Sequence, residues 1–288
     1  MTESEILSRI ARNAGASPRL IHGIGDDCAV YRPAPGLDLV YTTDFLIENI
    51  HFRRDTHTPA AIGRKCLARG LSDIAAMGAE PHFCLLSLAL PSWADSRFVN
   101  RFYSGFLSLA RRHATPLAGG DLAHAPQLTC DIVVCGAVRQ GKALLRSGAK
   151  PGDAIYVSGR LGNAAASGYT STIAPRLGLG RFLAGFATAA MDLSDGISQD
   201  LRRLALASAV TAVIDAPLPL ARGATEAQAL HGGEDYELLF TAPAAAPVPA
   251  SHDGVRLTRI GTIVKRTKHP VLHRGEPLTA AGYDHFQS

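Results

Sequence analysis

The sequence has few aromatic residues and no long apolar run. Phenylalanine, tyrosine and tryptophan make up only 6% of the 288 residues, so alanine, leucine, valine and isoleucine must fill most of the core. No apolar stretch approaches the roughly 20 residues of a membrane-spanning helix. The first residues, MTESEILSRIARNAG, carry charges throughout and lack the apolar segment of a signal peptide. We therefore expect a cytoplasmic protein with no membrane partner.

The sequence also lacks paired cysteines and a concentrated basic stripe. Its five cysteines are an odd number without any C-x-x-C pair, and several lie inside apolar runs, which predicts reduced, buried thiols. The formal net charge of +4 suits small anionic ligands, but Lys and Arg are scattered along the chain. Nucleic acid is therefore not an expected partner.

The common nucleotide and hydrolase motifs are absent. No G-x-x-x-x-G-K-[ST] loop occurs, and LGLGRFLAG has Leu183 where the third glycine of G-x-G-x-x-G belongs. The protein-kinase signatures, G-x-S-x-G and H-E-x-x-H are missing as well. If ATP binds, it must bind by another scheme.

Hydrophobic periodicity predicts alternating helices and strands in two domains. The first half has predicted helices at 3–13, 56–78 and 96–113 and predicted strands at 37–44, 83–90 and 128–138, a pattern that resembles a split β-α-β unit. The second half has predicted strands at 154–159, 189–195 and 211–216 and a helix at 197–208, and 241–254 is predicted to be a surface loop. The turn residues between the halves place the boundary near residue 140, which gives domains 1–140 and 141–288.

Acidic residues repeatedly follow small residues, often where an apolar strand ends. A single Gly-Asp or Ser-Asp pair is more often a turn or a helix cap. Six such places in one chain favour a different interpretation, in which carboxylates hold Mg²⁺ against phosphates and supply the charge neutralisation that phosphoryl transfer needs. They are GIGDD, TTD, LSD, GGD, MDLSDG and GGED.

At these motifs the chain resembles the thiamine-monophosphate kinases, in the superfamily of aminoimidazole ribonucleotide synthetase. GIGDDCAV, TTDFLIENIHF, LSDIAAMGAEP, GGD, RSGAKPGD, MDLSDG, GGEDYEL and GYDHF occur in the family's order and cover nearly the whole chain. The resemblance implies an α/β and α+β architecture, with an N-terminal ATP-binding, metal-binding and dimerisation domain and a C-terminal α+β domain. It also implies a homodimer that uses ATP and Mg²⁺ to phosphorylate thiamine monophosphate.

The resemblance also implies which residues take part in catalysis, metal binding and substrate binding. Catalysis is expected to depend on the carboxylates of Asp44, Asp121 and Asp195. The family's metal positions are Asp27, Thr42, Thr43, Asp44, Asp73, Asp121, Asp192 and Asp195. Its ATP contacts are Tyr103, Gly120, Asp121, Arg146 and Ser194, and its acceptor contacts are His51, Glu234 and Tyr283.

The acceptor positions suit a cationic thiazolium, because Tyr283 offers an aromatic face and Glu234 a carboxylate. The sequence departs from the family at three places. The segment between Gly168 and Met191 is shorter than usual, GGDLAHAP replaces the common GGDTT, and Tyr283 stands where tryptophan is frequent.

Two alternatives stay open. One is another ATP-dependent enzyme of the superfamily, although residues 1–22 lack the cysteine and lysine of a selenophosphate synthetase and the chain ends FQS rather than in the cysteine of a hydrogenase-maturation protein. The other is a protein that binds a nucleotide or a thiamine phosphate without catalysis.

Overall fold

The computed structural model describes residues 10, 12–13, 15, 17–22 and 30–283, and it separates into two compact units. One unit comprises Met1–Ile74 and Ala79–Gly141, and the other comprises Ala75–Gly78 and Lys142–Ser288. Most of the predicted helix at 3–13 lies outside the described residues. No helix in the described part of the chain is both long and apolar enough to cross a membrane.

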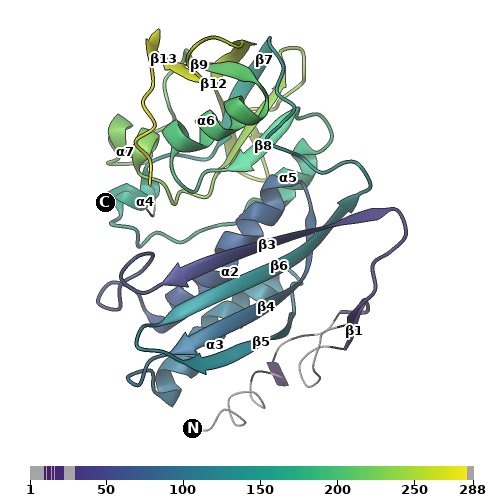
Figure 1. Cartoon of the computed structure of the whole chain (residues 1–288), viewed down its shortest axis with the longest axis vertical. Helices are drawn as coiled ribbons and strands as arrows, with labels where there is room; N and C mark the ends of the chain where they lie inside the picture. Colours follow the sequence, from purple (N-terminus) through teal and green to yellow (C-terminus); the bar gives the residue numbers. More distant parts are fainter. Residues whose placement is uncertain (1–9, 11, 14, 16, 23–29, 284–288) are drawn as a thin grey trace. The chain divides into compact units, whose positions relative to one another are not determined.

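The first unit is a four-stranded sheet with two helices on one face (Figure 1). Its strand order is β3 (Leu37–Ile47), β6 (Thr129–Arg139), β4 (Glu80–Leu90) and β5 (Leu117–His124), with β4 and β5 parallel and the other pairs antiparallel. Helices α2 (Pro59–Ala76) and α3 (Ser96–Arg112) lie behind the sheet in Figure 1. The short strands β1 (Leu20–His22) and β2 (Val30–Tyr31) complete the unit.

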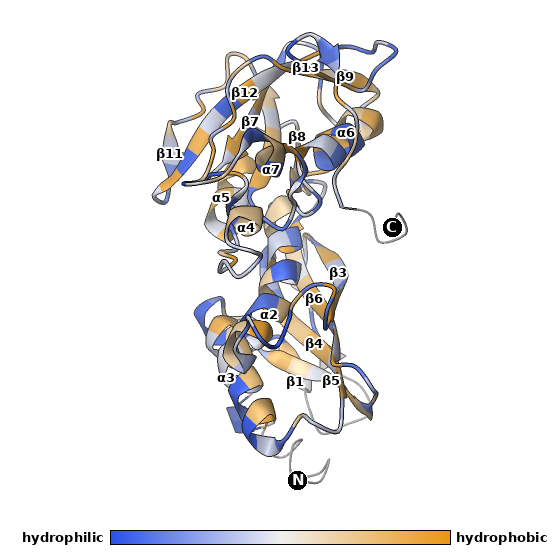
Figure 2. Cartoon of the chain, turned by 90° about the vertical axis from the view of Figure 1, so that its left-hand side faces the viewer, coloured by the Kyte–Doolittle hydropathy of each residue, from blue (hydrophilic) through white to orange (hydrophobic). Residues whose placement is uncertain are grey.

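Helix α3 shows why the predicted periodicity holds. Val99, Phe102, Phe106 and Leu109 recur at helical spacing and are buried, and polar and apolar patches alternate along the helix in Figure 2. Asp95 caps the helix by accepting a hydrogen bond from the N–H of Phe98 at 2.8 Å. An N-cap of this kind stabilises a helix by about 1 kcal/mol.

Strand β5 was not predicted, because its sequence LAGGDLAH is short of β-branched residues. It forms because α3 carries the chain back across the sheet and sets β5 parallel to β4, in the usual β-α-β crossover. The strand contains Gly120 and Asp121, so its pairing decides where these two residues lie.

The second unit is built on a larger mixed sheet. Its path is β14 (Glu276–Pro277), β13 (Val271–His273), β9 (Val210–Ile214), β12 (Val255–Lys265), β7 (Asp153–Ser158), β10 (Leu238–Pro243) and β8 (Ala189–Asp192), with β11 (Ser251–His252) paired to β12. The helices are α4 (Asn163–Ala166), α5 (Leu177–Leu183), α6 (Ile197–Ala207) and α7 (Glu226–His231). The expected mixed α/β and α+β architecture is confirmed.

The thiol prediction is confirmed for the four cysteines that the structure describes. Cys66, Cys84, Cys130 and Cys135 are free and buried, and burial raises the pKa of the Cys66 and Cys84 thiols. Cys28 lies outside the described residues.

Candidate functional site

Strand β3 distributes the TTD motif over both faces of its sheet, because successive side chains of a strand point to opposite sides. Thr42 and Asp44 point toward helix α2. The Thr42 hydroxyl donates to a carboxylate oxygen of Asp73, and a guanidinium nitrogen of Arg69 lies 3.1 Å from Oδ1 of Asp44. Helix α2 thus supplies partners to both side chains.

Arg69 was not predicted as part of the site. It precedes Asp73 by four residues on α2, so the two side chains lie on one face of the helix. The four-residue spacing from Asp73 was the sequence signal that could have identified Arg69. The ion pair with Asp44 is largely shielded from water, since the side chains of Arg69 and Asp44 are 10% and 24% exposed.

The opposite face of the sheet carries a second polar group. The Thr43 hydroxyl donates to Oδ1 of Asp131 at 2.6 Å. Asp131 lies opposite Ser87 on β4, and Ser87 lies opposite Asp121 on β5, so these side chains share one face. Asp131 was also not predicted as part of the site. Its charged side chain within the apolar strand sequence TCDIVV was the available signal.

Gly120 keeps strands β4 and β5 in register beside Asp121. Its φ is +153°, and a Cβ at this position would lie 1.9 Å from the carbonyl oxygen of Leu86. Only glycine therefore permits this close approach of the backbones. Asp121 itself is exposed, and its Oδ1 accepts a hydrogen bond from the N–H of Leu122 at 2.9 Å.

His51 and Tyr103 are both buried in the first unit. Nδ1 of His51 accepts from the N–H of Ile47 at 3.0 Å, so the neutral ring carries its proton on Nε2. The His51 carbonyl accepts from Nζ of Lys65 at 2.7 Å. Tyr103 packs with its neighbours on α3, and burial raises the pKa of its phenol, which stays protonated and can donate a hydrogen bond.

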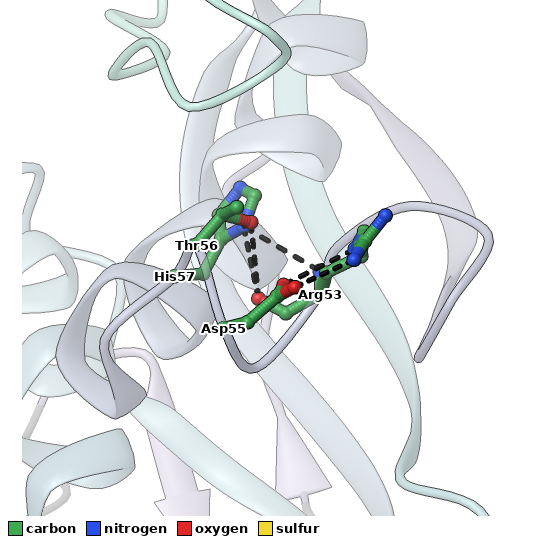
Figure 3. Close-up of polar contacts among 4 residues, drawn as sticks. All are labelled: Arg53, Asp55, Thr56 and His57. Carbon is green, nitrogen blue, oxygen red and sulfur yellow. Dashed lines mark hydrogen bonds and ion pairs between the residues drawn. The ribbon is translucent and has the colours of Figure 1, made fainter.

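A tight polar turn joins the segment after β3 to α2 (Figure 3). The guanidinium of Arg53 pairs with Asp55, the Thr56 hydroxyl donates to the Arg53 carbonyl at 3.3 Å, and the N–H of His57 bonds to the same carbonyl at 2.9 Å. Arg53 and Asp55 are well exposed, so their ion pair adds little stability. These contacts shape the turn that follows His51.

The second unit gathers several predicted residues around the turn that follows β8. Strand β8 ends at the buried Asp192, and Ser194 and Asp195 come next. The N–H of Glu234 donates to the Ser194 carbonyl at 2.7 Å, and the N–H of Tyr283 donates to the Asp195 carbonyl at 3.2 Å. Backbone hydrogen bonds thus place two predicted acceptor contacts beside this turn.

The Asp195 carboxylate is held by a network that sequence patterns did not reveal. Arg203 on α6 donates to Asp195, and a second contact joins Arg203 to Oδ1 of Asp200 at 2.9 Å. Oδ2 of Asp200 accepts from the N–H of Asp195 at 3.0 Å. Burial, reinforced by the nearby Asp195 charge, raises the pKa of Asp200 to about 7.

Arg146 lies on the exposed segment before β7, where its carbonyl accepts a hydrogen bond from the Ser208 hydroxyl at 2.8 Å. The same hydroxyl accepts from the N–H groups of Gly148 and Ala149, at 3.1 Å each. Ser208 therefore ties the RSGAKPGD segment to the end of α6. Asp27 lies outside the described residues.

The donors in the first unit have the chemistry that Mg²⁺ prefers, because they are hydroxyl and carboxylate oxygens. Within the described ranges, no three His, Cys, Asp or Glu side chains come close enough together to hold an ion by themselves.

Comparison with known proteins identifies the family to which the chain belongs. Residues 25–138 match the family described as AIR synthase related protein, N-terminal domain. The thiamine-monophosphate kinase of Escherichia coli (strain K12) is 39% identical over 300 residues, covering 92% of this chain and 91% of that protein.

Solved structures extend the likeness to the whole fold. The thiamine-monophosphate kinase from Stenotrophomonas maltophilia K279a superposes with a TM-score of 0.85 at 36% identity, covering 96% of this chain and 98% of that one. AaThiL complexed with AMPPCP and TMP superposes with a TM-score of 0.80 at 28% identity, covering 99% of each chain. The chain belongs to the thiamine-monophosphate kinase family.

Proposed function

We propose that this chain transfers the terminal phosphoryl group of ATP to thiamine monophosphate and so produces thiamine diphosphate. The observation that carries the proposal is the likeness, over 99% of the chain, to a protein solved with AMPPCP and TMP. The grouping of Glu234 and Tyr283 at the Ser194–Asp195 turn supports it.

The proposed metal-binding oxygens of the first unit form two groups: Thr42, Asp44 and Asp73 on the α2 side of the sheet, and Thr43 and Asp121 on the opposite face. Bound Mg²⁺ would neutralise negative charge on the phosphates. Arg69 holds the Asp44 carboxylate in place, and Asp131 accepts the Thr43 proton, which leaves the lone pairs of that hydroxyl to act as a ligand.

In the second unit, Asp192 and Asp195 are proposed as further metal positions, and Arg146 and Ser194 as ATP contacts. In the first unit, Tyr103, Gly120 and Asp121 are proposed as ATP contacts. The carboxylate of Asp195 is oriented by Arg203. Two of the proposed metal-binding carboxylates thus form ion pairs with arginines, Asp44 with Arg69 and Asp195 with Arg203.

Acceptor recognition is proposed for Glu234, Tyr283 and His51. Tyr283 is 45% exposed as a whole residue, so it can contact a ligand. A thiazolium cation is attracted to an aromatic face and to a carboxylate. Because Nδ1 of His51 accepts from the backbone N–H of Ile47, the proton of the neutral ring lies on Nε2.

The proposed transfer is direct, without a phosphorylated enzyme. The acceptor phosphate is anionic near neutral pH and can attack without a strong protein base. Enzymes of this kind act mainly by positioning the two substrates and stabilising the developing charge. Asp44 and Asp195 both have arginine partners, which makes them poorer nucleophiles than unpaired carboxylates.

We also propose a homodimer formed by the first unit. The face of its sheet opposite α2 exposes two aromatic residues of β3, Tyr41 at 62% and Phe45 at 58%. Strands β1 and β2 cover one end of this face, where Tyr31 packs against Phe83 with ring centroids 5.1 Å apart. Exposed aromatic residues on a sheet face suit burial against a second copy. We also propose that the protein is cytoplasmic.

The decisive experiment is a coupled assay for ADP release with Mg²⁺, ATP and thiamine monophosphate. The expected result is ADP release that depends on both thiamine monophosphate and Mg²⁺. Tight binding of thiamine monophosphate without ADP release would instead support the non-catalytic alternative, and the proposed activity would be wrong.

A further inference from the structure

A buried ion pair joins the segment before α5 to the start of β10. Nε of Arg176 donates to Oε2 of Glu237 at 2.8 Å, and a second guanidinium nitrogen donates to Oε1. The side chains are 23% and 8% exposed. A two-point contact of this kind fixes orientation as well as distance, and loss of one partner would leave a buried charge without compensation.

The end of strand β7 is shaped around the same carboxylate. The Ser158 hydroxyl donates to Oε2 of Glu237 and accepts from the N–H of Leu238 at 2.8 Å. Gly159 has a φ of +60°, and a Cβ there would lie 2.1 Å from Oε1 of Glu237. The absence of a side chain at Gly159 gives the carboxylate its place between Ser158 and Arg176.

Glu237 ends a loop whose backbone is strained. Glu234 and Tyr236 have φ values of 57° and 50°, in the left-handed region that side chains disfavour. Such conformations persist only when surrounding contacts enforce them. Here the N–H of Tyr236 donates to the Leu193 carbonyl at 2.9 Å, and the N–H of Leu193 donates to the Glu237 carbonyl at 2.9 Å.

Glu237 therefore fixes the loop from two sides. Its backbone carbonyl binds Leu193, next to the Ser194–Asp195 turn, and its side chain is fixed by Arg176 and Ser158. Glu234 lies three residues earlier in the same loop. A displacement of Glu237 would be passed to Glu234 through only two intervening residues, of which Tyr236 is strained.

We propose that Arg176 is a positioning residue for the phosphoryl acceptor, because its ion pair with Glu237 holds the loop that presents Glu234. The inference rests on the proposed function for the role of Glu234. Arg176 belongs to the segment between Gly168 and Met191, just before α5. This segment thus contributes a contact that orients the acceptor loop without touching the acceptor.

The test compares Arg176→Met, which keeps an apolar stem but removes the charge, with Arg176→Lys, which keeps the charge but not the two-point geometry. Arg259→Met is the matched control. Arg259 also makes a two-point pair, with Asp215 at 2.9 and 3.1 Å, but it lies on β12 and both side chains are well exposed.

The first measurement needs no ligand. Hydrogen exchange at the amides of Glu234, Tyr236 and Leu238 reports whether the loop is held. We expect exchange about tenfold faster in Arg176→Met, a smaller increase in Arg176→Lys and no change in Arg259→Met, because only the first two weaken the contact with Glu237. Unchanged exchange in Arg176→Met would overturn the proposal.

The second measurement is steady-state kinetics with thiamine monophosphate. We expect KM for thiamine monophosphate to rise about tenfold in Arg176→Met, with KM for ATP within about twofold, because misplacement of one contact group weakens binding of that substrate alone. Arg176→Lys should lie between Arg176→Met and the wild type, and Arg259→Met should match the wild type.

The outcomes separate the two hypotheses. Faster loop exchange with an unchanged KM for thiamine monophosphate would show that the ion pair is only structural, and the positioning role would be wrong. If Arg176→Met fails to fold, the same two measurements on Arg176→Lys decide. A wild-type chain that does not phosphorylate thiamine monophosphate would refute the proposed function, while the exchange measurement would still decide whether Arg176 holds the loop.

Discussion

Replacement of Asp44 by asparagine tests the proposed metal site most directly. The substitution removes one negative charge with little change in volume. The side-chain oxygen of asparagine can still accept a hydrogen bond from Arg69, which lies 3.1 Å from Oδ1 of Asp44 in the wild type. The change should therefore alter charge more than shape.

The expected cost in stability is modest. Breaking a fully buried ion pair costs about 3–5 kcal/mol. The Asp44 side chain is 24% exposed and a hydrogen bond to Arg69 can survive, so we expect a loss of about 1–2 kcal/mol. Thermal unfolding followed by circular dichroism measures this loss, and the variant should remain folded at 25 °C.

The expected cost in activity is much larger. If Asp44 helps to neutralise charge in the transition state, its removal should lower kcat by about 10²–10³-fold, as for other preorganised electrostatic groups. The assay is ADP release at saturating Mg²⁺, ATP and thiamine monophosphate. Saturating Mg²⁺ separates a loss of chemistry from a loss of metal affinity.

Asp38→Asn is the matched control for this experiment. Asp38 lies on the same strand, where its Oδ2 accepts from the N–H of Gly141 at 2.8 Å, and asparagine retains an oxygen for that bond. We expect this variant to keep wild-type turnover. Turnover near the wild-type value in a folded Asp44→Asn would refute the assignment of Asp44 to a metal site.

Four further predictions follow from the same site and fold. Asp121→Asn should fold normally, because Asp121 is exposed, yet lose phosphoryl transfer in the ADP assay; normal turnover would exclude it from the site. Light scattering at micromolar concentration should give twice the 30.3 kDa chain mass, and Phe45→Glu should shift it toward the monomer by placing charge on the exposed sheet face. A stable mass near 30.3 kDa for the wild type would contradict the dimer. Incubation with γ-labelled ATP and Mg²⁺ without acceptor should leave no label on the denatured protein, whereas label that thiamine monophosphate then discharges would establish a phosphorylated enzyme. Burial lowers the pKa of His231, so the unfolded chain takes up this proton before the folded chain does as the pH falls below about 6.5. The free energy of unfolding should therefore decline in that range, and His231→Asn should reduce the slope of this decline. An identical slope in the variant would contradict the prediction.

The sequence by itself determined the elements with clear periodicity and the family. The helices predicted at 56–78 and 96–113 are observed at Pro59–Ala76 and Ser96–Arg112. The strands predicted at 83–90 and 128–138 are observed at Glu80–Leu90 and Thr129–Arg139. They were predicted because their patterns match helices and apolar strands over many residues. The order of short acidic motifs identified the thiamine-monophosphate kinase family, because each motif needs particular residues at fixed positions.

Only the tertiary structure decided which side chains meet. Thr42 and Thr43 are neighbours in sequence, but the pleat sends one to Asp73 on α2 and the other to Asp131 on β6. Strand β5 was invisible to propensity, since its pairing with β4 depends on the crossover through α3.

Partners far apart along the chain could not be found from local patterns. Arg176 and Glu237 are 61 residues apart, and Ser158 and Glu237 are 79 apart. The sequence around each residue does not predict these contacts, because they form only where the end of β7, the start of β10 and the start of α5 lie together in the fold. The family motifs therefore identify the residues proposed to touch the substrates, whereas the fold determines the arginines and carboxylates that hold them in place.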